Sequence, residues 1–412
     1  MRRIYLDHNA TTPVHPAVLQ AMLPFFSGEF GNASSIHGFG QRARAAVETA
    51  REQVAALVNA RPQEIVFTSG GTESDNHAIF GVVSPLVTWP AQKGTNPIED
   101  IQKHRSIAHF RHVITTLIEH EAVLNTCQEL EKHGVAVTYL RVSRDGLIDV
   151  EELRQAIRPE TVLITVMHAN NEIGTVQPLR EIGRMAAERG IAVHTDAVQS
   201  VGKIPVDVEE CGVQLLSLSG HKIYAPKGVG ALYVKSGTRV MQFLYGGHHQ
   251  RGFRPGTENV AGIVGLGKAA ELARLSLDED AERIGALRDR LEKGLLARVA
   301  DARANGATAP RTSNTCNITF AGIEAEALVI ALDLKGVACS TGAACSSGAL
   351  EPSHVLMAIG LPAEEARASV RFSLGHGTTQ EEIDAVLEIV PSAVAQLREL
   401  SPTYKKEAHR RA

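Results

Sequence analysis

Short apolar runs alternate with helix-like segments over residues 64–234, and this alternation restricts the fold more than any other feature. EIVFTS (64–69), HVITTLIEH (112–120) and IAVHTDAVQS (191–200) are examples of such runs. Runs this short and this apolar are typical of strands buried on both faces, which requires a parallel sheet covered by helices on either side. We therefore expect an α/β fold with a mostly parallel sheet in this part of the chain.

The pattern changes after RPGTENV (254–260). A long helical region, roughly 261–300, is followed by NTCNITF, ALVIALDLKGVACSTG, SVRFSLG and a last helix. This order predicts a second, smaller α+β domain. The boundaries that we expect are 14–259 for a large domain, 1–13 with 260–400 for the small domain, and 401–412 for a polar, basic tail.

Composition excludes several classes of protein. The 412 residues are 44% hydrophobic and 21% charged, as in a soluble globular protein, and a net charge of −4 gives nucleic acid little to bind. MRRIYLDHNATT lacks the apolar run of a signal peptide, and no stretch approaches the ~18 apolar residues of a membrane span. Five cysteines without framework spacing predict a reducing, cytoplasmic environment. The 17 histidines are scattered, so we expect no metal site and interpret segment 88–111 as a surface insertion.

Polar residues collect where the expected strands end, and ligands bind at the carboxyl ends of parallel strands. These residues are Thr72, His120, Asn171, Asp196 and the SGHK motif at 219–222.

Lys222 and Asp196 together indicate pyridoxal phosphate. A lysine that forms a Schiff base must be neutral part of the time, so its site must lower its pKa from about 10.4. Ser219, His221 and Thr72, with the free N–H groups of the helix that GGTESDN begins, can bind a phosphate. A carboxylate such as Asp196 can hold a protonated pyridine nitrogen. Each residue alone could equally be a helix cap or a surface ion-pair partner, but the pair at strand ends favours the cofactor.

A second cluster is CSTGAACSSGALEPSHVL (339–356). Cys345 lies among glycine, alanine and serine, a composition that favours a mobile, exposed loop and leaves its thiolate available as a nucleophile. We expect Cys127, Cys316 and Cys339 to be buried and Cys211 to be structural.

The motifs of the chain resemble those of the cysteine desulfurases, the NifS/IscS-like branch of the class V aminotransferases with pyridoxal-phosphate fold type I. They are LDHNATTP, TSGGTESDN, HANNEIG, DAVQSVGK, SGHKIYAPKGVGALYV, RPGTENV, TGAACSSGALEPSHVL and VRFSLG, in the family's order from residue 4 to about 400. The resemblance implies a large domain with a mostly parallel seven-stranded sheet flanked by helices, plus a smaller α+β domain that carries the cysteine loop. It also implies removal of sulfur from L-cysteine, giving L-alanine and a persulfide that passes to an iron–sulfur scaffold or a tRNA-thiolation protein.

The resemblance assigns roles to single residues of a homodimer. Lys222 would bind the cofactor covalently and take the substrate's α-proton, His120 would stack on the ring and move protons, and Cys345 would accept the sulfur. The implied cofactor contacts are Gly71, Thr72, Ser219 and His221 at the phosphate, Asp196 at the ring nitrogen, Gln199 at the phenolic oxygen, Asn171 beside the cofactor, and Thr257 at the phosphate in the partner subunit. The implied substrate-carboxylate ligands are Arg371, Asn171 and Asn32.

Two alternatives remain open. Selenocysteine lyases share the fold, a long insertion near 88–111 and the FRPGTEN and NTCN motifs, but the continuation SSGALEPSHVL after Cys345 favours a desulfurase. A sulfur-carrier or assembly subunit without catalysis is the non-enzymatic alternative, and the presence of Lys222, Asp196 and Cys345 argues against it. His8 and Ile118 depart from the family pattern, and we attach no function to His8.

Overall fold

The computed structural model describes residues 3–83, 111–341, 351–400 and 404. Cys345, the basic residues of the tail and nearly all of segment 88–111 lie outside the described residues.

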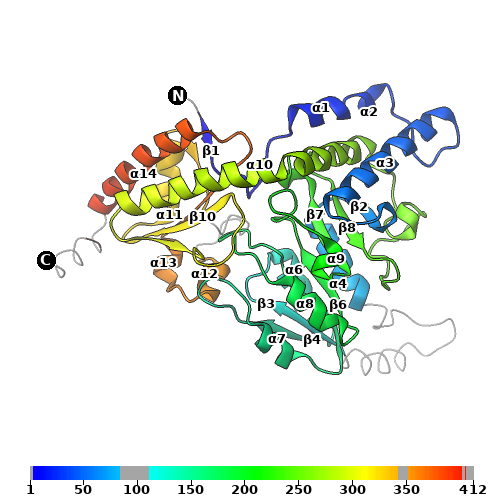
Figure 1. Cartoon of the computed structure of the whole chain (residues 1–412), viewed down its shortest axis with the longest axis horizontal. Coiled ribbons are helices and arrows are strands. Elements are labelled where there is room, and N and C mark those ends of the chain that lie inside the picture. Colours follow the sequence, from blue (N-terminus) through cyan, green and yellow to red (C-terminus); the bar gives the residue numbers. More distant parts are fainter. Residues whose placement is uncertain (1–2, 84–110, 342–350, 401–403, 405–412) are drawn as a thin grey trace.

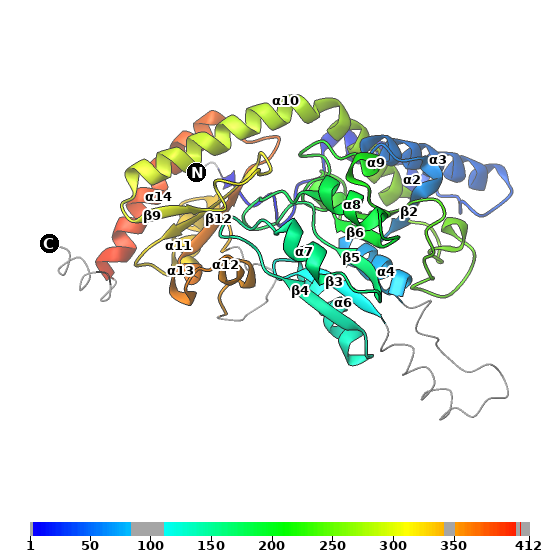
Figure 2. The same cartoon turned by 60° about the horizontal axis from the view of Figure 1, so that its bottom comes forward.

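A seven-stranded sheet forms the larger of two α/β layers (Figures 1 and 2). Its strand order is β2-β8-β7-β6-β5-β3-β4, and β8 is the one strand of the seven that runs in the opposite direction to the other six. The strands are β2 (Ile65–Thr68), β3 (His112–Thr116), β4 (Ala136–Leu140), β5 (Thr161–Thr165), β6 (Ala192–Asp196), β7 (Leu215–Ser219) and β8 (Gly230–Val234). The predicted mostly parallel sheet is confirmed.

Helices cover both faces of this sheet, which is why its strands are almost continuously apolar. Successive residues of a strand point to opposite faces, so Leu163 and Ile164 of β5 belong to two different apolar clusters. Leu163 packs with α4 (Gly71–Val83) and α6 (Glu121–Lys132), and Ile164 packs in the cluster of the other face. The helices that contribute to that second cluster are α1 (Pro16–Met22), α3 (Gly38–Leu57), α7 (Val150–Ala156), α8 (Leu179–Ala187), α9 (Val208–Cys211) and the first half of α10 (Val260–Arg298).

A smaller antiparallel sheet has the order β12-β10-β9. Its strands are β9 (Ala302–Asn305), β10 (Thr315–Phe320) and β12 (Ser369–Ser373), and a separate pair joins β1 (Ile4–Tyr5) to β11 (Val337–Ala338) in parallel. The described α-helices of this part are α11 (Ala325–Asp333), α12 (His354–Ala358), α13 (Ala363–Arg367) and α14 (Gln380–Leu400), whereas α2 (Pro24–Ser27) lies next to α1. The expected smaller α+β layer is therefore present, whereas the exact domain boundaries stay predictions.

Helix α10 connects the two layers (Figure 1). Ile263 and Leu266, in its first half, pack in the core of the large sheet, and Leu291 and Leu295, near its end, pack in the core of the small sheet. Within the described ranges, no helix is both long and apolar enough to span a membrane.

The expected burial of Cys127, Cys316 and Cys339 is confirmed, whereas a structural role of Cys211 stays a prediction. Cys127, Cys316 and Cys339 are buried, Cys211 is partly exposed, and all four are free thiols.

Gly183 and Gly285 give a matched test of helix packing. A Cβ at position 183 would overlap the backbone oxygen of Cys211, because α8 and α9 approach closely there, so Gly183→Ala forces the helices apart. We expect Gly183→Ala to lower the free energy of unfolding by about 1–3 kcal/mol. At position 285 the new Cβ meets only Ser313 Cβ at 3.8 Å, so Gly285→Ala should raise it by about 0.5–1 kcal/mol through helix propensity. Urea unfolding of both variants measures this, and an unchanged Gly183→Ala midpoint would contradict the close approach.

Candidate active site

The candidate site lies where strands of the large sheet end and face the small sheet. Asp196 ends β6, Ser219 ends β7, and the 3-10 turn Gly220–Lys222 follows at once. Carboxyl ends of parallel strands meet at one edge of a sheet, so residues far apart in sequence come together here.

Asn9 joins the residues of this edge to those of the small sheet. It is 2% exposed, and its backbone oxygen accepts hydrogen bonds from Lys222 Nζ at 2.5 Å and from Gln199 Nε2 at 3.0 Å. The partners of its side-chain amide are Thr315 Oγ1 (2.8 Å) and the Asn171 backbone oxygen (3.1 Å) for Nδ2, and Lys203 Nζ (3.0 Å) and Asn314 Nδ2 (2.9 Å) for Oδ1. The sequence analysis missed this residue, and its only signal was its place in LDHNATTP.

Lys222 is held in place by backbone carbonyl groups. Besides its bond to Asn9, its Nζ donates to the backbone oxygen of Ala10 at 2.8 Å. These contacts direct the amine toward the N-terminal segment that crosses the edge of the sheet.

Asp196 is a buried carboxylate that fits a cationic ligand. It is 7% exposed, and its Oδ1 accepts a hydrogen bond from the backbone N–H of Val198 at 2.9 Å. Burial raises the pKa of Asp196, and the positive charges of His120 and Lys222 oppose that rise. No ion pair to Asp196 occurs among the described residues. A protonated ring nitrogen would supply the missing charge, so the carboxylate fits pyridoxal phosphate.

His120 is the N-cap residue of α6. Its Nδ1 accepts a hydrogen bond from the backbone N–H of Ala122 at 3.1 Å, so in the neutral ring the proton is on Nε2. The cap fixes the ring orientation and leaves Nε2 as the donor, so capping a helix and a role in the site are compatible.

The first turn of α4 provides free backbone N–H groups beside Ser219. A Cβ at Gly71 would lie 2.9 Å from Val198 Cγ2 and 3.7 Å from Ser219 Cβ, so a larger residue would crowd this cradle. His221 Nδ1 bonds Thr11 Oγ1 at 3.1 Å, and burial lowers the pKa of His221 to about 4. His221 is thus neutral at physiological pH and can serve an anion as a hydrogen-bond donor.

Arg371 and Asn171 present one unsatisfied donor and one unsatisfied acceptor side by side. Arg371 Nη1 donates to the Asn171 backbone oxygen at 2.9 Å, and Nη2 donates to Asp7 Oδ1 at 2.8 Å. Arg371 Nε and Asn171 Oδ1 are buried and have no hydrogen-bond partner in the described part of the chain. A buried orphan group costs about 1–3 kcal/mol, and an amino acid could satisfy both with its carboxylate and its ammonium group.

Not every predicted residue joins this group. Asn32 is exposed between α2 and α3, where its Oδ1 accepts from the Ser34 N–H at 2.9 Å, and Thr257 is exposed in the loop before α10. No contact within the described ranges connects either to Lys222 or Arg371, so their roles stay predictions. The role of Cys345 also stays a prediction.

Two buried carboxyl groups beside the site were missed. Glu119 is fully buried, accepts from the Met167 N–H at 3.0 Å and from Thr116 Oγ1 at 2.8 Å, and burial raises its pKa to about 8. Asp75 lies 3.6 Å from His194 Nε2, and burial raises its pKa well above the ordinary value. Neither shift can be inferred from IEHEAV or TESDN, because burial causes both.

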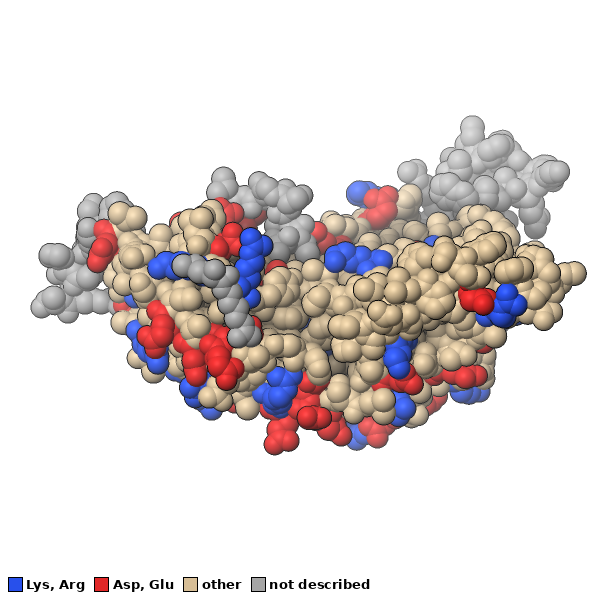
Figure 3. All heavy atoms as spheres, turned by 90° about the horizontal axis from the view of Figure 1, so that it is seen from above, with Lys and Arg blue, Asp and Glu red and all other residues tan. Residues whose placement is uncertain are grey.

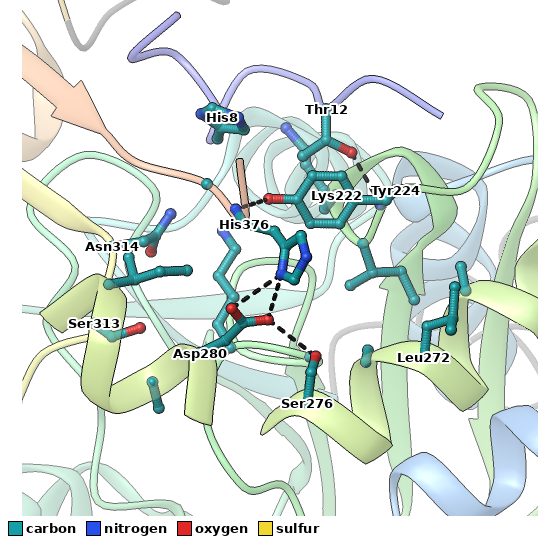
Figure 4. A pocket seen from close by; sticks show the side chains of 18 of the residues that line it. His8, Thr12, Lys222, Tyr224, Leu272, Ser276, Asp280, Ser313, Asn314 and His376 are labelled. Carbon is teal, nitrogen blue, oxygen red and sulfur yellow. Dashed lines mark hydrogen bonds and ion pairs between the residues drawn. The ribbon is translucent and has the colours of Figure 1, made fainter. Parts of the chain in front are cut away.

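A cavity of about 280 Å³ adjoins the site (Figure 4). His376 points into it, with Nδ1 2.8 Å from Asp280 Oδ2, and its backbone N–H donates to the Tyr224 hydroxyl at 2.6 Å. The cavity shares Lys203 and Lys222 with the site. Among the described residues, no group of three or more His, Cys, Asp and Glu side chains could hold a metal ion.

Comparisons with known proteins agree with this geometry. Residues 4–386 match the family model "Aminotransferase class-V". The chain is 48% identical over 406 residues to cysteine desulfurase IscS of Dictyoglomus turgidum, which covers 98% of each protein. It is 49% identical over 408 residues to a cysteine desulfurase of Trichormus azollae, which covers 99% of this chain and 97% of the relative.

The chain belongs to the cysteine desulfurase branch of the class-V aminotransferases.

Solved structures of the family have the same fold. A NifS-like protein superposes with a TM-score of 0.84 at 35% identity, over 96% of this chain and 100% of the other. A structure described as SspA in complex with cysteine superposes with a TM-score of 0.77 at 38% identity, over 90% of this chain and 98% of the other. The family resemblance inferred from the motifs is confirmed, as is the fold that it implied.

Glu119 should make stability depend on pH. Its pKa is about 8 in the folded protein and 4.5 in an ordinary environment, so between these values the folded state holds a proton that the unfolded state has lost. Stability from this group is therefore full below about pH 4.5 and is lost as the pH rises toward 8. We expect Glu119→Gln to become steadily more stable relative to the unmodified protein from pH 5 to 8, measured by urea unfolding. Glu152→Gln, at an exposed position, is the control; parallel curves for Glu119→Gln and the unmodified protein would refute the buried proton.

Proposed function

We propose that the chain is a pyridoxal-phosphate-dependent cysteine desulfurase, which converts L-cysteine to L-alanine and transfers the sulfur to Cys345. The observation that carries the proposal is a set of three groups: Lys222, the buried carboxylate of Asp196 and Nε of Arg371. In the described part of the chain, the carboxylate has no ion-pair partner and Nε has no acceptor. Relatives named cysteine desulfurase, at 48% and 49% identity over nearly the whole chain, support the reaction. A solved relative described as bound to cysteine supports the substrate.

The cofactor would be held from three directions. When bound, pyridoxal phosphate supplies an electron sink for the bonds at the substrate's α-carbon. Asp196 would keep the ring nitrogen protonated, and Gln199 Nε2 would donate to the phenolic oxygen. The phosphate would receive N–H groups of Gly71 and Thr72 at the start of α4, and hydrogen bonds from the side chains of Thr72, Ser219 and His221. Lys222 would attach the cofactor covalently.

The substrate would lie between Arg371 and Lys222. The carboxylate would bind Arg371 Nε, while Asp7 and the Asn171 backbone oxygen fix the two other nitrogens of the guanidinium. Lys222 Nζ would remove the α-proton as an amine. Nε2 of His120, held in the donor form by its cap, would move a second proton within the site.

Sulfur transfer would use the Cys345 thiolate. The thiolate would attack the substrate's sulfur while the Cβ–S bond breaks. The carbon skeleton would take up one proton at Cβ, regain a proton at the α-carbon from Lys222, and leave as L-alanine. The persulfide on Cys345 would then pass its outer sulfur to an acceptor protein, such as an iron–sulfur scaffold or a tRNA-thiolation protein. The four free thiols in the described part of the chain support the expected cytoplasmic location.

The homodimer that the family resemblance implied is also part of the proposal. Large apolar side chains are exposed on α1, on α2, in the connection 28–37 and at the start of α3, and this face carries few charged groups (Figure 3). They are Leu19, Leu23, Phe26, Phe30, Ile36 and Phe39. Exposed apolar patches of this kind mark interfaces, and a second copy would bring Thr257 to the partner's phosphate.

Cys345→Ser should abolish alanine release from L-cysteine by at least about 100-fold while the protein keeps the visible colour of its cofactor. The reason is that serine cannot accept sulfur, whereas cofactor binding does not use this residue. Cys211→Ser, at a partly exposed cysteine outside the site, is the matched control and should keep full activity. Parallel assays with selenocysteine separate the lyase: release from selenocysteine alone, or an active Cys345→Ser variant, would replace desulfurase by selenocysteine lyase.

Phe26→Asp combined with Phe30→Asp should raise the concentration at which the dimer dissociates by at least about 10-fold, because charge at a buried apolar contact is unfavourable. Light scattering over a dilution series measures this. Leu334→Asp, at a residue 79% exposed on the opposite layer, is the control. A monomeric unmodified protein, or equal dissociation of both variants, would contradict an interface at α1–α3.

A further inference from the structure

Lys203 is a second lysine in the candidate site, and it bonds two amide oxygens. Its Nζ lies 3.0 Å from Asn9 Oδ1 and 2.6 Å from Gln199 Oε1. No carboxylate lies within ion-pair distance of it among the residues that the structure describes. Lys203 is partly exposed, and its Nζ donates to amide oxygens and to no carboxylate among the described residues, so its contacts call for an explanation other than an ion pair.

The charges around Lys203 disfavour its cationic form. Burial lowers the pKa of Lys203 well below its ordinary value, and the positive charges of Lys222 and Arg371 lower it further. His8 and His221 also face it, and burial lowers the pKa of each to about 4, so both are neutral near pH 7. A neutral amine keeps two N–H groups, so Lys203 can donate to both amide oxygens in either protonation state.

These two hydrogen bonds determine how the Gln199 amide is turned. Because Lys203 donates to Oε1, the NH2 group of Gln199 must face the other way, and Nε2 donates to the Asn9 backbone oxygen beside Lys222. The orientation of the Asn9 side-chain amide is determined in the same manner, because its Oδ1 accepts hydrogen bonds from both Lys203 Nζ and Asn314 Nδ2. The bond from Nε2 to the Asn9 backbone oxygen favours the same orientation, and Lys203 adds the donor that the amide oxygen needs on its other side.

We infer that Lys203 is a positioning residue of the cofactor site, which holds the Gln199 amide so that its NH2 group faces the phenolic oxygen of bound pyridoxal phosphate. The inference rests on the proposed function and adds a residue that acts through another. It also connects the two sides of the site, because the same ammonium or amine holds Asn9, whose Nδ2 reaches the Asn171 backbone oxygen next to Arg371.

The orientation of the Gln199 amide should affect the visible absorption of the bound cofactor. A donor at the phenolic oxygen stabilises negative charge there, which makes the nitrogen that joins Lys222 to the cofactor easier to deprotonate. Loss of the donor should therefore move the pH midpoint of the visible absorption band upward. A hydrogen bond to a charged group corresponds to a shift of about one pH unit.

The test is a double-mutant cycle on the cofactor-loaded protein, read by absorption as a function of pH. We expect Lys203→Met to raise the midpoint by about one unit, Gln199→Ala to raise it by a similar amount, and the double variant to shift no further than Gln199→Ala alone. Lys235→Met, at a lysine paired with Glu209 outside the site, is the matched control and should leave the midpoint unchanged.

Each other outcome overturns the inference. An unshifted Lys203→Met shows that the lysine does not orient the amide, and an equal additional shift on the Gln199→Ala background shows that its charge acts independently of Gln199. We expect Lys203→Met to fold, because methionine removes a poorly solvated amine and should leave the midpoint of thermal unfolding unchanged or higher. A Lys203→Met variant that unfolds would show that the lysine has a structural role instead. A wild-type protein that binds no cofactor would overturn the proposed function as well, whereas normal wild-type binding with an unshifted Lys203→Met overturns this inference alone.

Discussion

The buried amide of Asn9 is the contact on which the site depends. Its backbone and side chain bond residues that come from both sheets, among them Lys222 after β7, Gln199 after β6 and Thr315 of β10. A buried asparagine that uses nearly all of its hydrogen-bonding capacity allows few alternative arrangements, because each lost partner leaves an unsatisfied group. The N-terminal segment reaches this position because β1 pairs with β11 and the His8 N–H bonds the Ser373 backbone oxygen at 3.1 Å.

The electrostatics of the site follow from this enclosed arrangement. Burial raises the pKa of two carboxyl groups here, Asp196 and Glu119, and the positive charges of His120 and Lys222 oppose that rise at Asp196. Only Asp7 is within ion-pair distance of Arg371 among the residues described. Among the described residues, the site therefore has a buried carboxylate without an ion-pair partner and an arginine nitrogen without an acceptor. A cationic cofactor ring would suit the first, and the carboxylate of an amino-acid substrate would suit the second.

Much of this could be predicted from the sequence, because the relevant signals are local. Strand periodicity located β5, β6 and β7, and the rule that ligands bind at the carboxyl ends of parallel strands then singled out Asp196 and Lys222. The family motifs supplied Gln199 and Arg371, which periodicity alone does not distinguish from core residues.

What could not be predicted depends on contacts between distant segments. Lys203 and Asn9 are 194 positions apart, and nothing in DAVQSVGK shows that its lysine meets a buried amide oxygen. The pKa of Glu119 is raised by burial, which only the packed structure reveals. Asn32 and Thr257 are exposed, and no contact among the described residues connects either one to Lys222 or Arg371.

Helix α10 has one further consequence, for any attempt to divide the protein. Its first half packs in one core and its second half in the other, while Ile4 and Leu6 of the N-terminal segment also belong to the core of the small sheet. Any cut within 260–298 therefore leaves part of the small-sheet core on the wrong piece. Splitting the protein at this helix, by design or by limited proteolysis, would separate a hydrophobic core from some of the residues that pack in it. Chain breaks that preserve folding belong in exposed connections instead, such as the turn around Gly237, where an added Cβ meets no atom within 4 Å.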